Sequence, residues 1–253
     1  MGNLVTRFPN GVGTLAESHP LADMGMLSPT KHVVIFDDFM NPASATVSDV
    51  QAWTAVNDGA TGTPAFQDAL GGVFNVVTAA ADNDYAAYSS VNEVFLFTTG
   101  KKLWFEARVK VAEATTNEST WWVGLTDTVT TGGMQANTAG PLASYDGALF
   151  FKTPETALTL NFESSNAGTQ VTNSAEWTTV SDTWTKVAFY YDGGTTIKPY
   201  AAVNGSDTWV GGAAQTISTT GLEEMHVVYG IKAGPTAGAE TLQLDYIFVA
   251  QER

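Results

Sequence analysis

Hydrophobic and polar residues alternate with a period of two along most of the chain after residue 31. The pattern is clearest in segment 101–111, where the odd-numbered residues from Leu103 to Val111 are apolar. The even-numbered residues from Lys102 to Lys110 are charged, apart from Trp104. Because successive side chains of a β-strand point to opposite faces, this segment predicts a strand with one buried and one wetter face. Such strands favour an antiparallel sheet.

Similar short segments follow one another to the end of the chain, separated by turns rich in Gly, Asp and Asn. The pair Asn204-Gly205 predicts a hairpin, because both residues tolerate a positive φ. No segment predicts a helix of three turns, and a long loop is expected between Thr126 and Asp146. The expected strands are His32–Phe39, Val50–Val56, Val73–Thr78, Asp84–Ser89, Glu93–Phe97, Lys101–Val111, Trp121–Leu125, Gly147–Thr153, Thr156–Ser164, Gln170–Thr179, Trp184–Asp192, Lys198–Val203, Met225–Ile231 and Thr241–Ala250.

This series predicts an all-β fold, a jelly-roll β-sandwich of two sheets that forms one domain over residues 32–253. Residues 1–31 show no helix or strand periodicity and contain three prolines, so we expect an extended N-terminal arm. The 28 aromatic residues of the 253-residue chain are enough to fill the space between two sheets.

Charge is distributed unevenly between these two parts. The net charge is −15, from 11 Lys and Arg against 26 Asp and Glu. The arm is neutral, with Arg7 and Lys31 against Glu17 and Asp23, so the whole imbalance lies on residues 32–253. An acidic body repels phosphate backbones, which argues against nucleic-acid binding. A neutral, partly apolar arm can pack against another protein without repulsion.

Several residue types and motifs that the sequence lacks reduce the number of possible functions. The chain has no cysteine, which excludes disulfides and thiolate metal sites. No signal-peptide pattern and no apolar run of about 18 residues is present, so we expect no membrane partner. The three histidines are far apart in sequence, and no Gly-x-Ser-x-Gly or metal-binding spacing occurs. We therefore expect no cofactor and no metal site.

The order and character of several segments resemble the concanavalin A-like lectin/glucanase sandwich. The resemblance spans about residues 33 to 250. It rests on Phe36–Phe39, Lys101–Lys110, Trp121–Asp127, Trp184–Asp192, Val203–Gly205 and Leu244–Ile247.

The two ends of the chain resemble a family of tailed-bacteriophage capsid decoration or minor head proteins. This resemblance rests on Val5–Val12, Pro29–Lys31 and Asp245–Arg253. The most distinctive part is Arg7–Gly11, because a sandwich fold does not need such a motif. The long loop between Thr126 and Asp146 departs from the family's pattern.

The family resemblance implies a structural virion protein on the outer surface of the capsid, made in the host cytoplasm. Its partners would be the major capsid protein and neighbouring copies of itself in a homo-oligomer. It would bind and stabilise the assembled head partly through its N-terminal arm. The arm residues expected to contact the capsid are Leu4, Val5, Arg7, Phe8, Pro9, Asn10 and Val12.

An enzymatic function is not expected. Glucanases with the concanavalin A-like sandwich that this chain resembles carry a Glu-x-Asp-x-(x)-Glu strand. This strand places two carboxyls about 5–5.5 Å apart around the scissile bond in retaining enzymes. The segment Tyr145–Lys152, which leads into the strand expected after Trp121–Leu125, has one acid near its start, Asp146, and no Glu. Glu106 shares its face with Arg108 and Lys110, which favours an ion-pair role.

A glycan-binding, lectin-like module on a virion or cell surface is the alternative. Exposed aromatic rings can stack on sugars, but most Trp residues are buried in cores. Trp104 differs from the other Trp residues because it lies among charged residues on the wetter face of its strand. It is therefore the candidate for a glycan-binding or subunit-interface residue.

Overall fold

The computed structural model describes residues 21, 27–28, 30–39, 53–58, 65–67, 72–114, 116–130, 133–135, 140–154, 158–236 and 238–253. This part of the chain forms sixteen strands. They are β1 (His32–Asp37), β2 (Trp53–Asn57), β3 (Ala65–Gln67), β4 (Val73–Val77), β5 (Tyr85–Ser90), β6 (Leu103–Ala112), β7 (Thr120–Thr126), β8 (Gly147–Lys152), β9 (Thr159–Asn166), β10 (Thr169–Thr178), β11 (Thr185–Tyr191), β12 (Thr196–Ala202), β13 (Val210–Gly211), β14 (Gln215–Thr216), β15 (His226–Lys232) and β16 (Thr241–Glu252).

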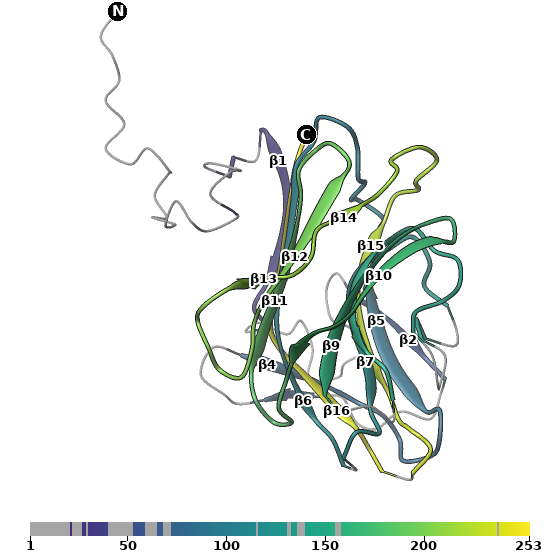
Figure 1. Cartoon of the computed structure of the whole chain (residues 1–253). Helices are drawn as coiled ribbons and strands as arrows, with labels where there is room; N and C mark the ends of the chain where they lie inside the picture. The colour runs from purple at the N-terminus through teal and green to yellow at the C-terminus, as the bar shows by residue number, and fades with distance from the viewer. Residues whose placement is uncertain are drawn as a thin grey trace, which may run out of the picture.

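The strands form two sheets that lie face to face (Figure 1). Sheet A has nine strands in the order β13-β12-β11-β6-β16-β4-β3, with β1 added to β16 and β14 added to β12. Sheet B has seven strands in the order β10-β9-β8-β7-β15-β5-β2. Every strand pairing in the described part is antiparallel. The predicted two-sheet sandwich is therefore confirmed.

The core lies between the two sheets and is rich in aromatic rings. In β6, the apolar residues from Leu103 to Val111 are buried, as their alternation predicts. Phe105 stacks on Phe189 of the neighbouring strand β11, with ring centroids 5.0 Å apart. Phe150 of sheet B lies 6.4 Å from Phe189, so the aromatic contacts cross from one sheet to the other. Burial of these rings is a main source of the stability of the sandwich.

The observed strands differ from the predicted ones at the shortest elements. Residues 93–97 form only an isolated bridge, between Phe95 and Met225, instead of the predicted strand. Strands β3, β13 and β14 were not predicted, because two or three residues are too short to show a period of two. At the predicted hairpin, Asn204 and Gly205 have φ values of 57° and 76°, and the loop that contains them joins β12 to β13.

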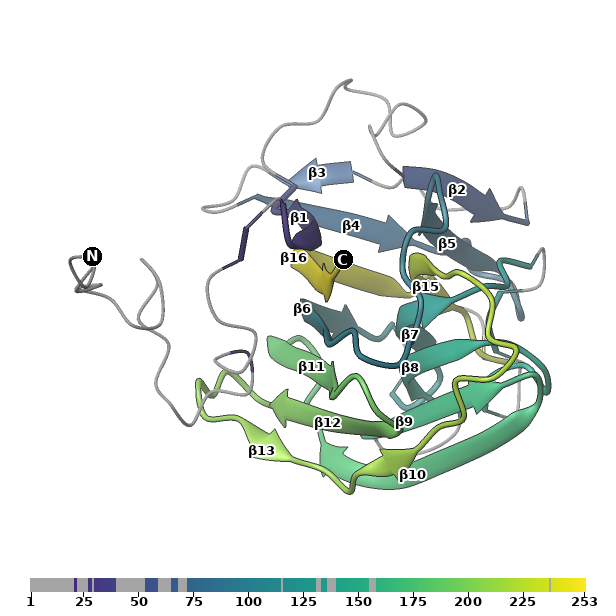
Figure 2. The same ribbon diagram turned by 90° about the horizontal axis from the view of Figure 1, so that it is seen from above.

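The beginning of β1 and the end of β16 lie together at the same end of sheet A (Figure 2). The Arg253 backbone N–H donates to the Lys31 carbonyl at 2.7 Å. The predicted boundary between arm and body coincides with the first residue of β1, while the division into two units stays a prediction. Within the described residues, no helix has the length and apolar character needed to cross a membrane.

Candidate functional site

Described residues of the long loop that follows β7 pack on the outer face of sheet B, the face turned away from sheet A. Met134 is 3% exposed and belongs to an apolar cluster on this face with Tyr85, Trp122 and Val228. The Lys232 ammonium donates to the Gln135 carbonyl at 3.1 Å, and the Gln135 amide donates to the Lys152 carbonyl at 3.1 Å. These contacts fix the loop over the middle of the sheet.

Next to this loop, a groove of about 540 Å³ remains open over β8, β9 and β10. Its walls combine the end of the loop with polar residues of two adjacent strands. In β9, Leu160 and Phe162 point into the core, so the period of two turns Asn161 and Glu163 outward. The groove is lined by Gly140, Pro141, Phe151, Thr153, Thr159, Asn161, Glu163, Gln170, Thr172, Ser174 and Ala175.

Glu163 is the centre of the hydrogen bonds in the groove. Its Oε1 accepts from the Tyr145 hydroxyl at 3.1 Å and from the Gln170 amide at 2.8 Å, and its Oε2 accepts from the Thr172 hydroxyl at 2.5 Å. The Gln170 amide also donates to the Leu142 carbonyl at 2.7 Å. Burial raises the pKa of Glu163, and the bonds from Thr172 and Tyr145 oppose this shift. The carboxylate therefore ties the end of the covering loop to β10.

Asn161 shapes the rim of the groove where β10 bulges. The pairing of β10 with β9 changes register between Asn173 and Trp177, and Ala175 has a φ of 55°. The Asn161 amide oxygen accepts from the Ala175 backbone N–H at 2.8 Å, and its amide nitrogen donates to the Phe151 carbonyl at 3.2 Å. This side chain satisfies a backbone group that the bulge removes from the ladder. The bulge thus has a fixed shape beside Glu163.

The groove combines hydroxyl, amide and carboxylate groups, which can hydrogen-bond to a polyhydroxylated ligand. Among the lining residues that the structure describes, Glu163 is the only one with a carboxyl group. Retaining or inverting glycoside hydrolysis ordinarily needs a pair of carboxyls across the scissile bond. The described lining therefore holds one carboxyl group among several uncharged hydrogen-bonding groups.

The structure corrects the prediction for Trp104. Its side chain is completely buried, and its indole N–H donates to Glu106 at 3.1 Å. The rings of Tyr200 and Trp209 lie 6.1 and 6.3 Å from it, centroid to centroid. Trp104 belongs to a cluster on the outer face of sheet A, and the partly buried Leu21 and Leu27 of the arm pack against that cluster. Trp104 therefore has no free ring face for a sugar.

Glu106 also has a different role from the predicted ion pair. It accepts hydrogen bonds from Trp104 and from the Tyr246 hydroxyl, the latter at 2.5 Å. Arg108 instead pairs with Asp245 at 2.5 Å. The predicted capsid contacts Leu4, Val5, Arg7, Phe8, Pro9, Asn10 and Val12 lie outside the described residues, so they stay predictions.

Sequence reasoning did not identify Asn161, Glu163, Gln170 and Thr172 as site residues. A signal was available in segment 159–166, where polar residues alternate with Leu160 and Phe162. The alternation identifies an outward polar face. It does not show that this part of the outer face stays open while the neighbouring part of the same face is covered by the loop.

Comparisons with known proteins support the fold. A Shewanella oneidensis protein of unknown function matches with a TM-score of 0.58 and 14% identity, over 90% of this chain and 95% of that chain. Peanut lectin matches with a TM-score of 0.59 and 13% identity, over 87% of this chain and 97% of the lectin chain. Lectin II of Ulex europaeus matches with a TM-score of 0.59 and 8% identity, over 86% of this chain and 98% of the lectin chain. No protein-family model and no curated protein sequence matches the chain.

These similarities support the sandwich part of the predicted resemblance. They give no support to its tailed-phage part. At such low identities, they establish the fold alone. The chain has a concanavalin A-like β-sandwich fold, similar to that of the legume lectins.

Proposed function

We propose that the protein is a carbohydrate-binding module that acts by binding and not by catalysis. The polar groove over β8–β10 is the observation that supports this function. Its volume is within the range of small-ligand sites, about 300–1,000 Å³. Several neighbours in fold are lectins, one of them in complex with galactose, which favours a saccharide over other polar ligands. The ligand would lie along β9 and β10 and hydrogen-bond to their outward side chains.

Filling the groove is expected to abolish saccharide binding without unfolding the protein. Ser174 is an exposed groove residue, so Ser174→Trp places a bulky ring where the ligand would lie. Thr169→Trp is the matched control, because Thr169 is an exposed residue of the same strand outside the groove lining. Binding is measured on a glycan array and by calorimetry, and folding by thermal denaturation. Equal binding by the two variants, or no saccharide ligand for the unmodified protein, would contradict the proposal.

Attachment to a virus capsid is a second candidate, and the anchoring of the arm favours it. Leu21 and Leu27 pack on the cluster around Trp104, so these two residues of the arm are held on the outer face of sheet A. The Arg7–Gly11 motif lies ahead of that anchor in the sequence. In this candidate, the residues before Leu21 contact the major capsid protein, and many symmetry-related copies in homo-oligomers add their contacts on the outer surface of the head.

Removing residues 1–20 is expected to abolish capsid attachment while the sandwich stays folded. This truncation keeps Leu21 and Leu27 on the Trp104 cluster, whereas removal of residues 1–31 would uncover that cluster. The measurement is co-sedimentation with shells assembled from the major capsid protein of the virus that carries the gene. The full chain is the positive control. Full occupancy by the truncated protein would rule out attachment through the arm, and no binding by the full chain would rule out the capsid role.

A further inference from the structure

We propose that the groove selects saccharides that carry a free amino group, with the ligand ammonium paired to Glu163. This specificity rests on the proposed carbohydrate-binding function and names the ligand class of the same site. It follows from the charge that Glu163 brings to the groove and from the absence of a cationic side chain beside it in the described part of the chain.

Glu163 is buried, and no described residue places a positive charge beside its carboxyl. The residue is 5% exposed, and its three described hydrogen-bond donors are a phenol, an amide and a hydroxyl. Every Lys and Arg of the chain except Arg7 lies in the described part, and none of these lines the groove or pairs with Glu163. A buried carboxylate is costly unless a cation compensates it. A ligand ammonium would supply that missing charge.

The geometry leaves room for such a contact. From the described residues, Oε1 of Glu163 already accepts two hydrogen bonds, whereas Oε2 accepts one, from Thr172. A carboxylate oxygen has two lone pairs, so Oε2 keeps one acceptor site. An ammonium group has three donors, which suits one bond to Oε2 and others to nearby oxygens. Thr172 and Ser174 are exposed groove residues beside it and can bind ring hydroxyls.

The same charge disfavours other sugars. A uronic acid would place a second carboxylate near Glu163 and be repelled, because the described groove residues include no Lys or Arg. An N-acetylated amino sugar keeps the shape of the free amino sugar but has lost its positive charge. A neutral sugar would form hydrogen bonds only. The amino sugar is therefore the one class that compensates the buried charge.

The raised pKa of Glu163 gives the pairing a pH dependence. Affinity for an amino sugar should fall as the pH falls through this pKa, because protonation removes the attraction. Among the described residues, the side chains that hydrogen-bond to or pair with Glu163 stay uncharged as its carboxyl titrates. Burial raises the pKa of Tyr145 well above its usual value, and the facing residues of β8 and β10, Leu149, Gln170 and Thr172, have no charge.

Calorimetry with three oligosaccharides of equal length tests the proposal: a glucosamine oligomer, an N-acetylglucosamine oligomer and a neutral glucose oligomer, all at 0.15 M salt. We expect the glucosamine oligomer to bind at least about tenfold more tightly than the other two, the equivalent of 1.4 kcal/mol. Glu163→Gln should remove this preference and its dependence on acidic pH. Glu224→Gln should retain both, because it removes the same charge from an exposed position.

The outcomes distinguish a failure of the amino-sugar specificity from a failure of carbohydrate binding itself. Equal affinities for the three oligomers, or a preference that survives Glu163→Gln, would overturn the amino-sugar specificity and leave carbohydrate binding intact. A preference lost equally in Glu224→Gln would also overturn it, because general attraction to the acidic protein would then explain the binding. The comparison of the three oligomers on the unmodified protein tests the amino-sugar preference even if Glu163→Gln does not fold. Absence of binding by all three, together with an empty glycan array, would overturn both proposals.

Discussion

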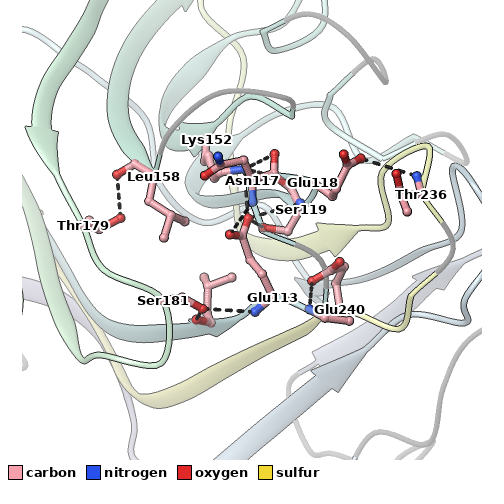
Figure 3. A network of polar contacts seen from close by, with 12 residues as sticks. Glu113, Asn117, Glu118, Ser119, Lys152, Leu158, Thr179, Ser181, Thr236 and Glu240 are labelled. Atoms are coloured by element: carbon pink, nitrogen blue, oxygen red, sulfur yellow. Dashed lines mark hydrogen bonds and ion pairs between the residues drawn. The ribbon is translucent and has the colours of Figure 1, made fainter.

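Replacing Lys152 with Met is expected to lower the free energy of unfolding by about 3–5 kcal/mol, the usual cost of breaking a buried ion pair. The Lys152 ammonium lies 3.0 Å from the Glu113 carboxylate, and each side chain is only 1% exposed. It also donates to the carbonyls of Asn117 and Ser119, at 3.0 and 2.6 Å (Figure 3). Met fills a similar volume but leaves the Glu113 charge without its cation.

Glu113 links this ion pair to the connection between β6 and β7. Its carboxylate accepts from the backbone N–H groups of Asn117 and Ser119, at 2.9 and 3.2 Å, and from the Ser119 hydroxyl at 2.6 Å. Figure 3 shows Glu113 beside Ser119, with Lys152 close to Asn117. Asn117 has a φ of 68°, so these bonds also hold a conformation that non-glycine residues rarely adopt. Loss of Lys152 should therefore loosen the whole connection.

Urea and thermal denaturation measure this effect. For a domain of this size, each kcal/mol shifts the melting temperature by about 2–4 °C. Lys186→Met is the matched control, because its partner Asp207 is 98% exposed and such pairs add little stability. Adding Glu113→Gln to Lys152→Met should recover part of the loss, since it neutralises the unpaired buried charge. A melting temperature of Lys152→Met equal to that of Lys186→Met would show that the pair does not stabilise the fold.

Replacing Trp104 with Ala is expected to destabilise the protein by about 3–5 kcal/mol, the range for removing a large buried ring. The side chain is completely buried among Ala188, Ala250 and the partly buried residues that pack on them, Leu27 included. The substitution leaves a cavity between the sheet and the covering segments. It also removes one hydrogen-bond donor from Glu106, which keeps its bond from Tyr246.

Trp184→Ala is the control for this substitution. Trp184 is partly exposed near the same face of sheet A, and the Arg108 guanidinium and Lys110 ammonium lie 4.6 and 5.4 Å from its ring centroid. Its loss removes these cation–π contacts and less buried area, so we expect a smaller change in melting temperature. If Trp104→Ala melted like the unmodified protein and lost saccharide binding, Trp104 would be a ligand-binding residue after all.

The period of two in the sequence was sufficient to predict most of the fold. In β6, it identified the buried face from Leu103 to Val111, because the alternation of side chains is a local property of an extended backbone. The positive φ values at Asn204 and Gly205 were predictable for the same reason, since turn preferences depend on the residues themselves. An antiparallel two-sheet sandwich follows from many such strands with short connections.

What covers each outer face was decided only by the tertiary structure. Trp104 lies on the face that the pattern predicts to be wetter, yet Leu21, Leu27 and Trp209 pack around it from segments distant in sequence. On sheet B, the loop that contains Met134 covers the middle strands and leaves Glu163 beside an open groove. A period of two assigns a side chain to a face, but burial of that face depends on which distant segments pack there. By itself, the sequence determined the sandwich and its inner face, whereas long-range packing buried Trp104 and placed Glu163 at the groove.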